Sequence, residues 1–89
     1  MQLEFEFDPA KSASNLEKHG LDFVTAQRLW DDHKFVLFPA EERGERREMA
    51  YASYEGKVWT AIFVRRGHRL RIISVRRARN HEVKIYEQG

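Results

Sequence analysis

The sequence contains no cysteine, so disulfide bonds and metal sites built on thiolates are excluded. Long hydrophobic runs are also absent: the apolar stretch at 61–64 is among the longest, whereas a membrane-spanning helix needs about 20 such residues. The segment 1–6 is acidic and alternates in polarity, which differs from a secretory signal peptide. These absences predict a cytoplasmic location, and the length of 89 residues predicts one domain over 1–89.

Patterns that hold cofactors and metal ions are missing as well. There is no glycine-rich phosphate loop, since Gly44, Gly56 and Gly67 stand where turns are expected. The four histidines never stand three or four residues apart and have no cysteine beside them, which argues against zinc. Glu41 and Glu42 lie in a predicted loop and indicate a solvated surface rather than a magnesium site. We therefore predict that the protein uses no cofactor and no metal ion.

Charge is present in quantity but is unevenly divided. Residues 1–56 hold seven Lys or Arg and twelve Asp or Glu, whereas residues 57–89 hold nine Lys or Arg and only two acids. Seven of those nine cations are arginines, whose planar fork matches phosphate oxygens. Two interpretations stay open at this point. The basic third either binds nucleic acid or is a solvated surface that meets acidic groups.

Hydrophobic spacing predicts an α+β domain in which two helices precede an antiparallel meander and one helix follows it. Asp8 and Pro9 are typical of a helix start, Gly20 of a helix end, and Asp22 of a second start. We expect Ala13 and Leu16 on the buried side of the first helix. The expected strands are 3–7, 34–38, 47–54, 57–65 and 69–76, the helices 9–19, 23–32 and 80–87, and the main loop 39–45.

The last predicted strand carries the sharpest local pattern. Because alternate residues of a strand share a face, one face is expected to hold Arg69, Arg71, Ile73 and Val75, and the other Leu70, Ile72 and Ser74. At its end Arg76 and Arg77 point to opposite sides, just before the last helix. Cations at such a junction are suited to hold a phosphate. The alternative is that these arginines pair with the acids of residues 1–56 and only hold the fold.

Lys18 and His19 close the first predicted helix. An imidazole titrates near neutral pH and serves as a general acid or base, so His19 is a candidate for proton transfer. The helix dipole also favours positive charge in a last turn, and capping is therefore the alternative role of this pair.

Two separated motifs resemble BrnT-type toxins, in order and spacing, over nearly the whole chain. The first is Phe7-Asp8-Pro9-Ala10-Lys11 followed by Asn15, Lys18-His19-Gly20 and Phe23; the second is Arg66-Gly67, Arg69 and Arg71-Ile72-Ile73-Ser74-Val75-Arg76-Arg77-Ala78, followed by Glu82 and Tyr86. Two departures are visible. Phe7 stands where tryptophan is common in the family, and Arg79 where a hydroxyl residue often caps the last helix.

The resemblance implies a RelE-like fold, with two N-terminal helices packed on a four-stranded antiparallel sheet and a C-terminal helix. It implies metal-independent RNA cleavage that arrests translation. It also implies a partner, a BrnA-type antitoxin with a ribbon-helix-helix domain, through which any contact with DNA is made.

Metal-free RNA cleavage needs groups that move protons and cations that surround the reacting phosphate, because the 2′-hydroxyl of the substrate can itself attack. The candidate catalytic residues are Lys18, His19, Arg71, Arg76, Arg77 and Glu82, and the candidate RNA-binding residues are Lys11, Arg69, Arg79 and Tyr86. An ion pair with Arg76 or Arg79 is the alternative for Glu82, and packing is the alternative for Tyr86. A non-catalytic nucleic-acid-binding module and a protein-interaction module are the alternative functions.

Overall fold

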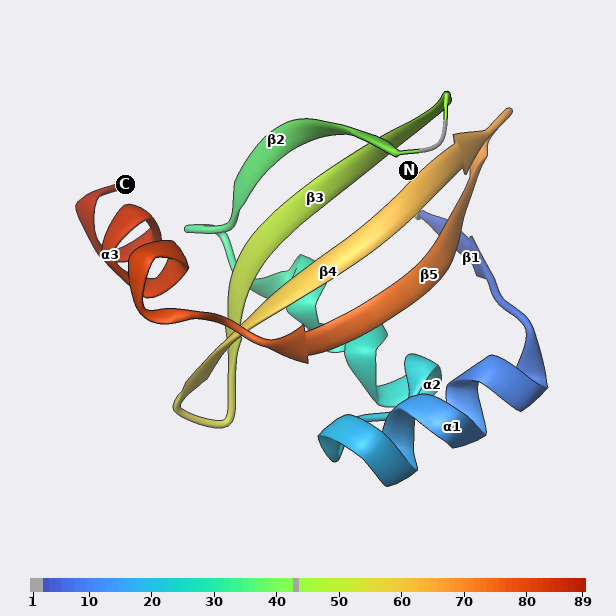
Figure 1. Ribbon diagram of the computed structural model, residues 1–89, viewed down its shortest axis with the longest axis horizontal. Coiled ribbons are helices and arrows are strands. Elements are labelled where there is room, and N and C mark those ends of the chain that lie inside the picture. Colours follow the sequence, from blue (N-terminus) through green and yellow to red (C-terminus); the bar gives the residue numbers. More distant parts are fainter. Residues whose placement is uncertain (1–2, 43) are drawn as a thin grey trace.

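The computed structural model describes residues 3–42 and 44–89 as a mixed sheet with helices along it (Figure 1). The elements are β1 (Glu4–Glu6), α1 (Pro9–His19), α2 (Phe23–Ala26), the 3₁₀ helix η1 (Gln27–Asp31), β2 (Val36–Glu42), β3 (Glu45–Tyr54), β4 (Lys57–Arg66), β5 (Arg69–Arg77) and α3 (Asn80–Gln88). The α+β class is therefore confirmed. In Figure 1, α3 lies at the opposite end of the molecule from α1.

The sheet has five strands in the order β1-β5-β4-β3-β2, which corrects the expected four-stranded sheet. The meander β2 to β5 is antiparallel as expected, but β1 joins β5 in parallel, with Phe5 opposite Leu70. A strand of three residues carries too little pattern to specify its partner. Pairing with β5 places β1 at the edge of the sheet, and the segment that follows β1 leads into α1.

The loop expected at 39–45 is mostly strand, because β2 continues through Pro39 to Glu42. Pro39 lies opposite Glu48 in β3, and β2 is the edge strand. A proline is tolerated there because its missing N–H removes no bond from a central ladder. Residue 43, which also falls in the expected loop, lies outside the described residues.

Both predicted helix starts are confirmed. Asp8 accepts a hydrogen bond from the backbone N–H of Ala10 at 2.9 Å, and Asp22 accepts one from Thr25 at 2.7 Å. Gly20 ends α1 with φ of +85°, in the left-handed region that glycine adopts readily. The second expected helix divides into α2 and η1. None of the described helices is long and apolar enough to cross a membrane.

The buried side of α1 differs from the expected one. Ala13 and Leu16 are exposed, Leu16 by 49%, while Ser12 and Asn15 are buried. Ser12 accepts a hydrogen bond from the backbone N–H of Phe23 at 2.8 Å, so its hydroxyl satisfies a donor at the start of α2. Polar side chains therefore face inward because backbone groups of other elements need partners there.

The hydrophobic core lies between the α2–η1 segment and one face of the sheet. Its buried members are Leu21, Phe23, Ala26, Leu29, Ala50, Ala52, Trp59, Ala61, Phe63, Leu70, Ile72 and Val75. Trp30 packs edge-on against Phe5 and Phe63, with ring centroids 5.1 and 5.2 Å apart. The expected inward direction of Leu70 and Ile72 is thus confirmed.

Candidate active site

A bulge in β5 decides which side chains of this strand share a face. Phe63 of β4 lies opposite Ile72, but its neighbour Ile62 lies opposite Ser74, so Ile73 is an extra residue. After the bulge the alternation is shifted by one position. Ser74 and Val75 therefore exchange the faces expected for them, and Val75 is fully buried in the core.

The face of β5 that points away from the core carries Arg71, Ser74 and Arg76. Their partners on β4 are Val64, Ile62 and Thr60, which alternate with the core residues of that strand. Arg77 points to the opposite face, where its guanidinium lies 5.6 Å from the ring centroid of Trp59. The structure thus groups Arg71 with Arg76 and separates Arg77 from them.

A cleft of about 220 Å³ lies between α1 and the bulge of β5. It is lined by Lys11, Ser14, Asn15, Lys18, His19, Ile73 and Ser74. These lining residues include two lysines and a histidine and no acid. Because Ser74 also stands between Arg71 and Arg76 on β5, the cleft joins the α1 cations to the arginine-bearing face.

Asn15 fixes α1 against β5 at this cleft. Its side-chain amide donates to the backbone carbonyls of Val75 (2.8 Å) and Leu21 (2.7 Å) and accepts from the N–H of Val75 at 3.2 Å. The strand β1 pairs only with residues 69–71 of β5, so the amide occupies the strand edge beyond it. The last turn of α1, with Lys18 and His19, is thereby held beside Ser74.

Each of the two grouped arginines is oriented by a carboxylate. Arg71 donates to Glu6 of β1 at 2.9 Å, and both side chains are half-buried. Arg76 donates through two nitrogens to Glu82 of α3, at 2.7 and 2.9 Å. A guanidinium has five N–H donors, so these bonds fix each side chain without using all of its donors.

Glu82 is buried at the start of α3, in the ion pair with Arg76. Burial alone would raise the pKa of Glu82, but hydrogen bonds from Arg76, the backbone of Arg79 and the Thr60 hydroxyl lower it to about 2. The same pair raises the pKa of Arg76. A carboxylate this acidic carries no proton near neutral pH. The ion-pair alternative for Glu82 is therefore the one that the structure contains.

Arg79 occupies the N-cap position of α3, but its side chain makes no capping hydrogen bond, because a guanidinium has no acceptor for the free N–H groups. Its backbone N–H donates to Glu82 at 2.8 Å, which is half of a capping box. The helix starts at Asn80 as expected, although the usual hydroxyl residue is missing.

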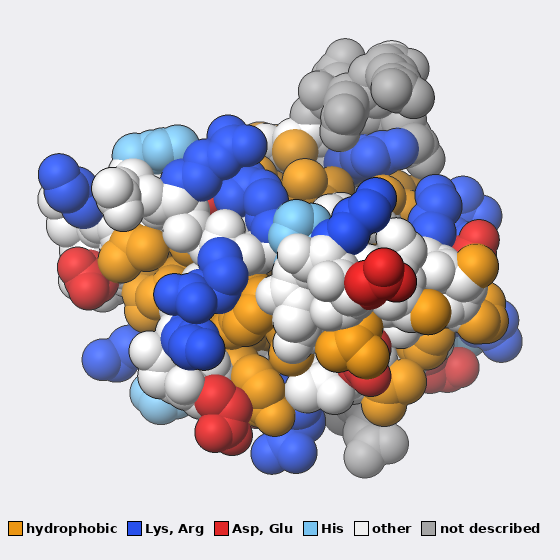
Figure 2. All heavy atoms as spheres, turned by 60° about the horizontal axis from the view of Figure 1, so that its bottom comes forward, with side chains coloured by type: hydrophobic (Ala, Val, Ile, Leu, Met, Phe, Trp, Pro, Cys, Tyr) orange, Lys and Arg blue, Asp and Glu red, His pale blue; other side chains and the backbone are white. Residues whose placement is uncertain are grey.

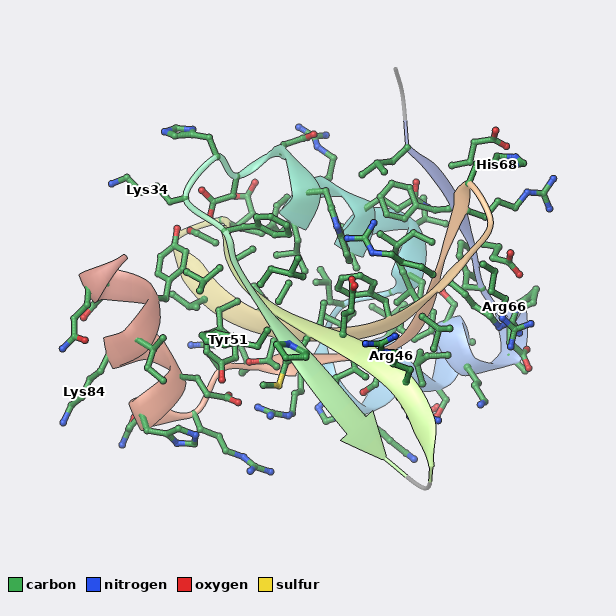
Figure 3. The ribbon with its side chains drawn as sticks, turned by 90° about the horizontal axis from the view of Figure 1, so that it is seen from above. Lys34, Arg46, Tyr51, Arg66, His68 and Lys84 are labelled. Atoms are coloured by element: carbon green, nitrogen blue, oxygen red, sulfur yellow. The ribbon has the colours of Figure 1, made fainter. Side chains whose placement is uncertain are left out.

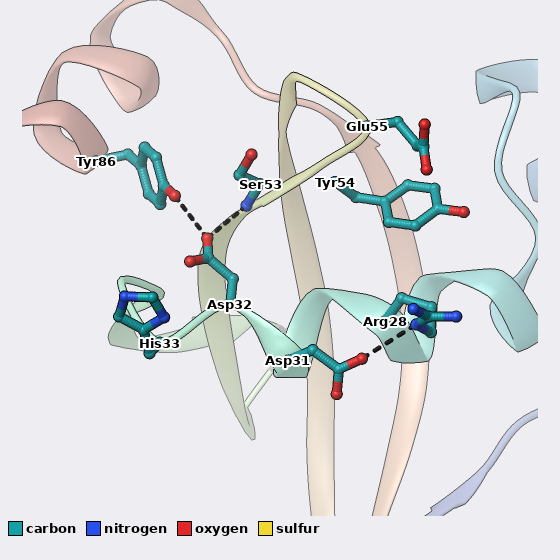
Figure 4. A pocket seen from close by; sticks show the side chains of 8 residues that line it. All are labelled: Arg28, Asp31, Asp32, His33, Ser53, Tyr54, Glu55 and Tyr86. Atoms are coloured by element: carbon teal, nitrogen blue, oxygen red, sulfur yellow. Dashed lines mark hydrogen bonds and ion pairs between the residues drawn. The ribbon is translucent and has the colours of Figure 1, made fainter.

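Tyr86 lies in a different hollow, of about 430 Å³, at the other end of α3 (Figure 4). Its hydroxyl donates to Asp32 at 2.5 Å, and Asp32 also accepts from the backbone N–H of Ser53 at 2.8 Å. Burial and the neighbouring Asp32 raise the pKa of Tyr86 to about 12. None of the residues that line this hollow lines the α1–β5 cleft.

The remaining candidates are surface cations. Arg69 is exposed, 3.8 Å from Glu4 of β1, and Arg79 is exposed at the start of α3. Figure 2 shows Lys and Arg side chains gathered in a band over one face, with histidines among them. Within the described residues, no three His, Asp or Glu side chains are grouped as metal ligands would be.

Sequence reasoning missed Ser74 and the structural role of Asn15. The face of Ser74 depends on the bulge, and no residue type in 69–76 marks where an extra residue falls. Asn15 belongs to the first of the two motifs that carry the family resemblance, and that was the signal in the sequence that pointed to a special role for it. Its spacing of three residues from Ser12 also repeats the helical period, so a polar buried stripe fits the sequence as well as an apolar one.

A comparison with protein families matches residues 7–82 to the family described as the ribonuclease toxin BrnT of type II toxin–antitoxin systems. The match covers most of the chain, including α1, the α1–β5 cleft and the Arg76–Glu82 pair. A search of curated proteins finds no match.

Proposed function

Because the chain belongs to the BrnT family of ribonuclease toxins, we propose that it cleaves RNA without a metal ion and so inhibits translation in the cytoplasm. Membership of a type II system implies a protein antitoxin as partner. We propose that this antitoxin is of the BrnA type, with a ribbon-helix-helix domain that contacts DNA, and that the fold is RelE-like.

The observation that supports this function is the position of Ser74, between Arg71 and Arg76 and beside Lys18 and His19. Phosphate groups of an RNA strand would meet cations from both α1 and β5 there. Such fixed cations stabilise the additional negative charge of the transition state without rearranging, so they favour reaction as well as binding.

In the proposed reaction the 2′-hydroxyl oxygen of the RNA attacks the adjacent phosphorus. His19 exchanges protons with the reacting oxygens, and Arg71, Arg76 and Lys18 surround the phosphorane. The bond between phosphorus and the 5′-oxygen breaks, and that oxygen takes up a proton. The products are a 2′,3′-cyclic phosphate and a 5′-hydroxyl end. The exposed cations Lys11, Arg69, Arg77 and Arg79 are proposed to hold the flanking RNA.

Cleavage of single-stranded RNA by the purified chain in excess EDTA tests the function. We expect cyclic phosphate ends, and we expect the same strand with 2′-deoxy sugars to stay intact. His19→Ala should lose most of the activity, whereas His68→Ala, at the turn between β4 and β5, should keep it. A strict need for a divalent ion would contradict the mechanism. Salt-sensitive binding without cleavage would favour the non-catalytic module.

A further inference from the structure

The carboxylate of Glu82 is enclosed by donors from the sheet and from its own helix. Glu82 is only 2% exposed, although charged side chains are seldom buried. It accepts from two nitrogens of Arg76 (2.7 and 2.9 Å), from the Thr60 hydroxyl (2.9 Å) and from the backbone N–H of Arg79 (2.8 Å). The carboxylate therefore occupies a site built for an oxyanion.

Most of this site belongs to the sheet rather than to α3. Tyr51, Thr60 and Arg76 are register partners across β3, β4 and β5, so their side chains share one face. Tyr51 lies beside α3 in Figure 3. Burial, and then the charge of Glu82, raises the pKa of Tyr51, so its hydroxyl keeps its proton. The site thus offers a guanidinium fork and two hydroxyls, and phosphate oxygens readily accept hydrogen bonds from such donors.

Polar contacts are prominent among those that hold α3 on the sheet. The only fully buried side chain of this helix is Glu82, whereas Val83 and Tyr86 are partly buried and Ile85 is exposed. Its other end is held by the hydrogen bond from Tyr86 to Asp32, and Lys84 points away from the sheet (Figure 3). A nine-residue helix is not stable alone. The polar contacts that Glu82 makes at the start of α3 are ones that a competing anion can replace.

We propose that Glu82 is an internal substitute for a phosphate group. It fills a phosphate-binding site formed by Tyr51, Thr60 and Arg76, and an RNA phosphodiester takes its place when the start of α3 lifts. This identification of the ligand rests on the proposed function. Ser74, at the α1–β5 cleft, is two residues from Arg76, about 7 Å along a strand. We call the phosphate-binding site that Glu82 fills the masked site. One RNA strand can therefore contact the cleft and the masked site together.

The test uses the full chain and a labelled 2′-deoxy oligonucleotide, which binds but lacks the attacking hydroxyl. Glu82→Gln removes the competing charge, and we expect its affinity to rise about tenfold because more molecules have an open site. The double variant Glu82→Gln with Arg76→Ala should lose this gain. Glu48→Gln is the matched control. It also neutralises a carboxylate that pairs with an arginine, Arg65, but on the other face of the sheet, and it should change the affinity for the oligonucleotide little.

Amide hydrogen exchange of the unaltered chain gives a second measurement that does not depend on how Glu82→Gln folds. Addition of the oligonucleotide should speed exchange in α3 if the phosphate displaces Glu82. Faster exchange in α3 from a chain that cleaves no RNA would leave the phosphate-binding site in place while refuting the ribonuclease function. Two results would contradict the proposal that Glu82 masks a phosphate-binding site. One is unchanged exchange in α3, and the other is equal affinity of folded Glu82→Gln and Glu48→Gln for the oligonucleotide.

Discussion

The side-chain amide of Asn15 binds both backbone groups of Val75, donating to its carbonyl at 2.8 Å and accepting from its N–H at 3.2 Å. Two bonds to one residue are what an adjacent strand would provide at the edge of a sheet. The side chain of Asn15, on α1, therefore occupies the hydrogen-bonding edge of β5 beyond the end of β1. This contact lies directly beside the bulge at Ile73 and the cleft that Asn15 helps to line.

Asn15→Ala should destabilise the fold by about 3 kcal/mol, because buried backbone groups of Val75 and Leu21 lose their partners. Urea unfolding followed by circular dichroism measures the change. Glu17→Ala, on the exposed side of the same helix, is the control and should shift the midpoint little. Equal midpoints for the two variants would show that the backbone groups find other partners.

Ile72→Ala should cost about 2–5 kcal/mol, since it opens a cavity in the core. Leu37→Ala, on the edge strand, removes a side chain that is 42% exposed and should cost much less. Thermal unfolding of both variants measures the difference. A larger loss for Leu37→Ala than for Ile72→Ala would contradict the position of Ile72 in the core.

The Arg76–Glu82 pair should make stability depend on acid pH. The pKa of Glu82 is lowered from 4.5 to about 2 in the folded chain, so its contribution is complete above pH 4.5 and is lost as the pH falls toward 2. That contribution is up to about 3 kcal/mol. Unfolding free energies of the unaltered chain and Glu82→Gln, measured between pH 2 and 6, should therefore converge at the acid end. A constant gap across this range would contradict the lowered pKa.

Tyr86→Phe should loosen the end of α3, because Asp32 loses its shortest hydrogen bond. Bonds to a charged acceptor contribute about 2 kcal/mol. Tyr54→Phe changes the same hollow and serves as the control. Nuclear magnetic resonance titration should also show the pKa of Asp32 rising in Tyr86→Phe, because the Tyr86 hydroxyl is one of the groups that lower it. An unchanged carboxyl titration would mean that this hydroxyl does not bind Asp32 in solution.

Arg71→Ala should slow RNA cleavage by a factor of roughly 10²–10³, as for the loss of a donor to a charged transition state. Arg71→Lys should restore only part of the rate, because the planar fork is lost. Arg77→Ala is the informative comparison: its side chain lies on the opposite face over Trp59, and we expect a small effect on the rate. Growth arrest and in vitro cleavage, with folding checked by circular dichroism, separate these outcomes. Equal losses for Arg71→Ala and Arg77→Ala would place the site elsewhere.

Local signals in the sequence predicted most of the elements. Asp8, Gly20 and Asp22 mark helix boundaries through hydrogen bonds and backbone angles that involve near neighbours. The hairpin at Glu55–Gly56 follows the same logic, with positive φ at both residues. Such interactions are encoded within a few residues, so one sequence suffices to find them.

What the sequence did not reveal depends on contacts between distant segments. The parallel pairing of β1, the inward direction of Ser12 and Asn15, and the bulge at Ile73 are each decided by a partner far along the chain. The faces assigned to Ser74 and Val75 were wrong for this reason, because one extra residue reverses every later side chain. The grouping of Lys18 with Ser74 likewise required the tertiary structure.

The parallel junction of β1 with β5 also bears on when the arginine-bearing face forms during synthesis of the protein. Arg71 pairs with the carboxylate of Glu6, 65 residues earlier, so the ribosome must reach β5 before the two can meet. Contacts this distant in sequence form late, because a long loop must close before they give any stability. Shorter nascent chains lack the completed arginine face. If Arg71 acts as proposed, ribonuclease activity therefore begins only after translation has passed β5.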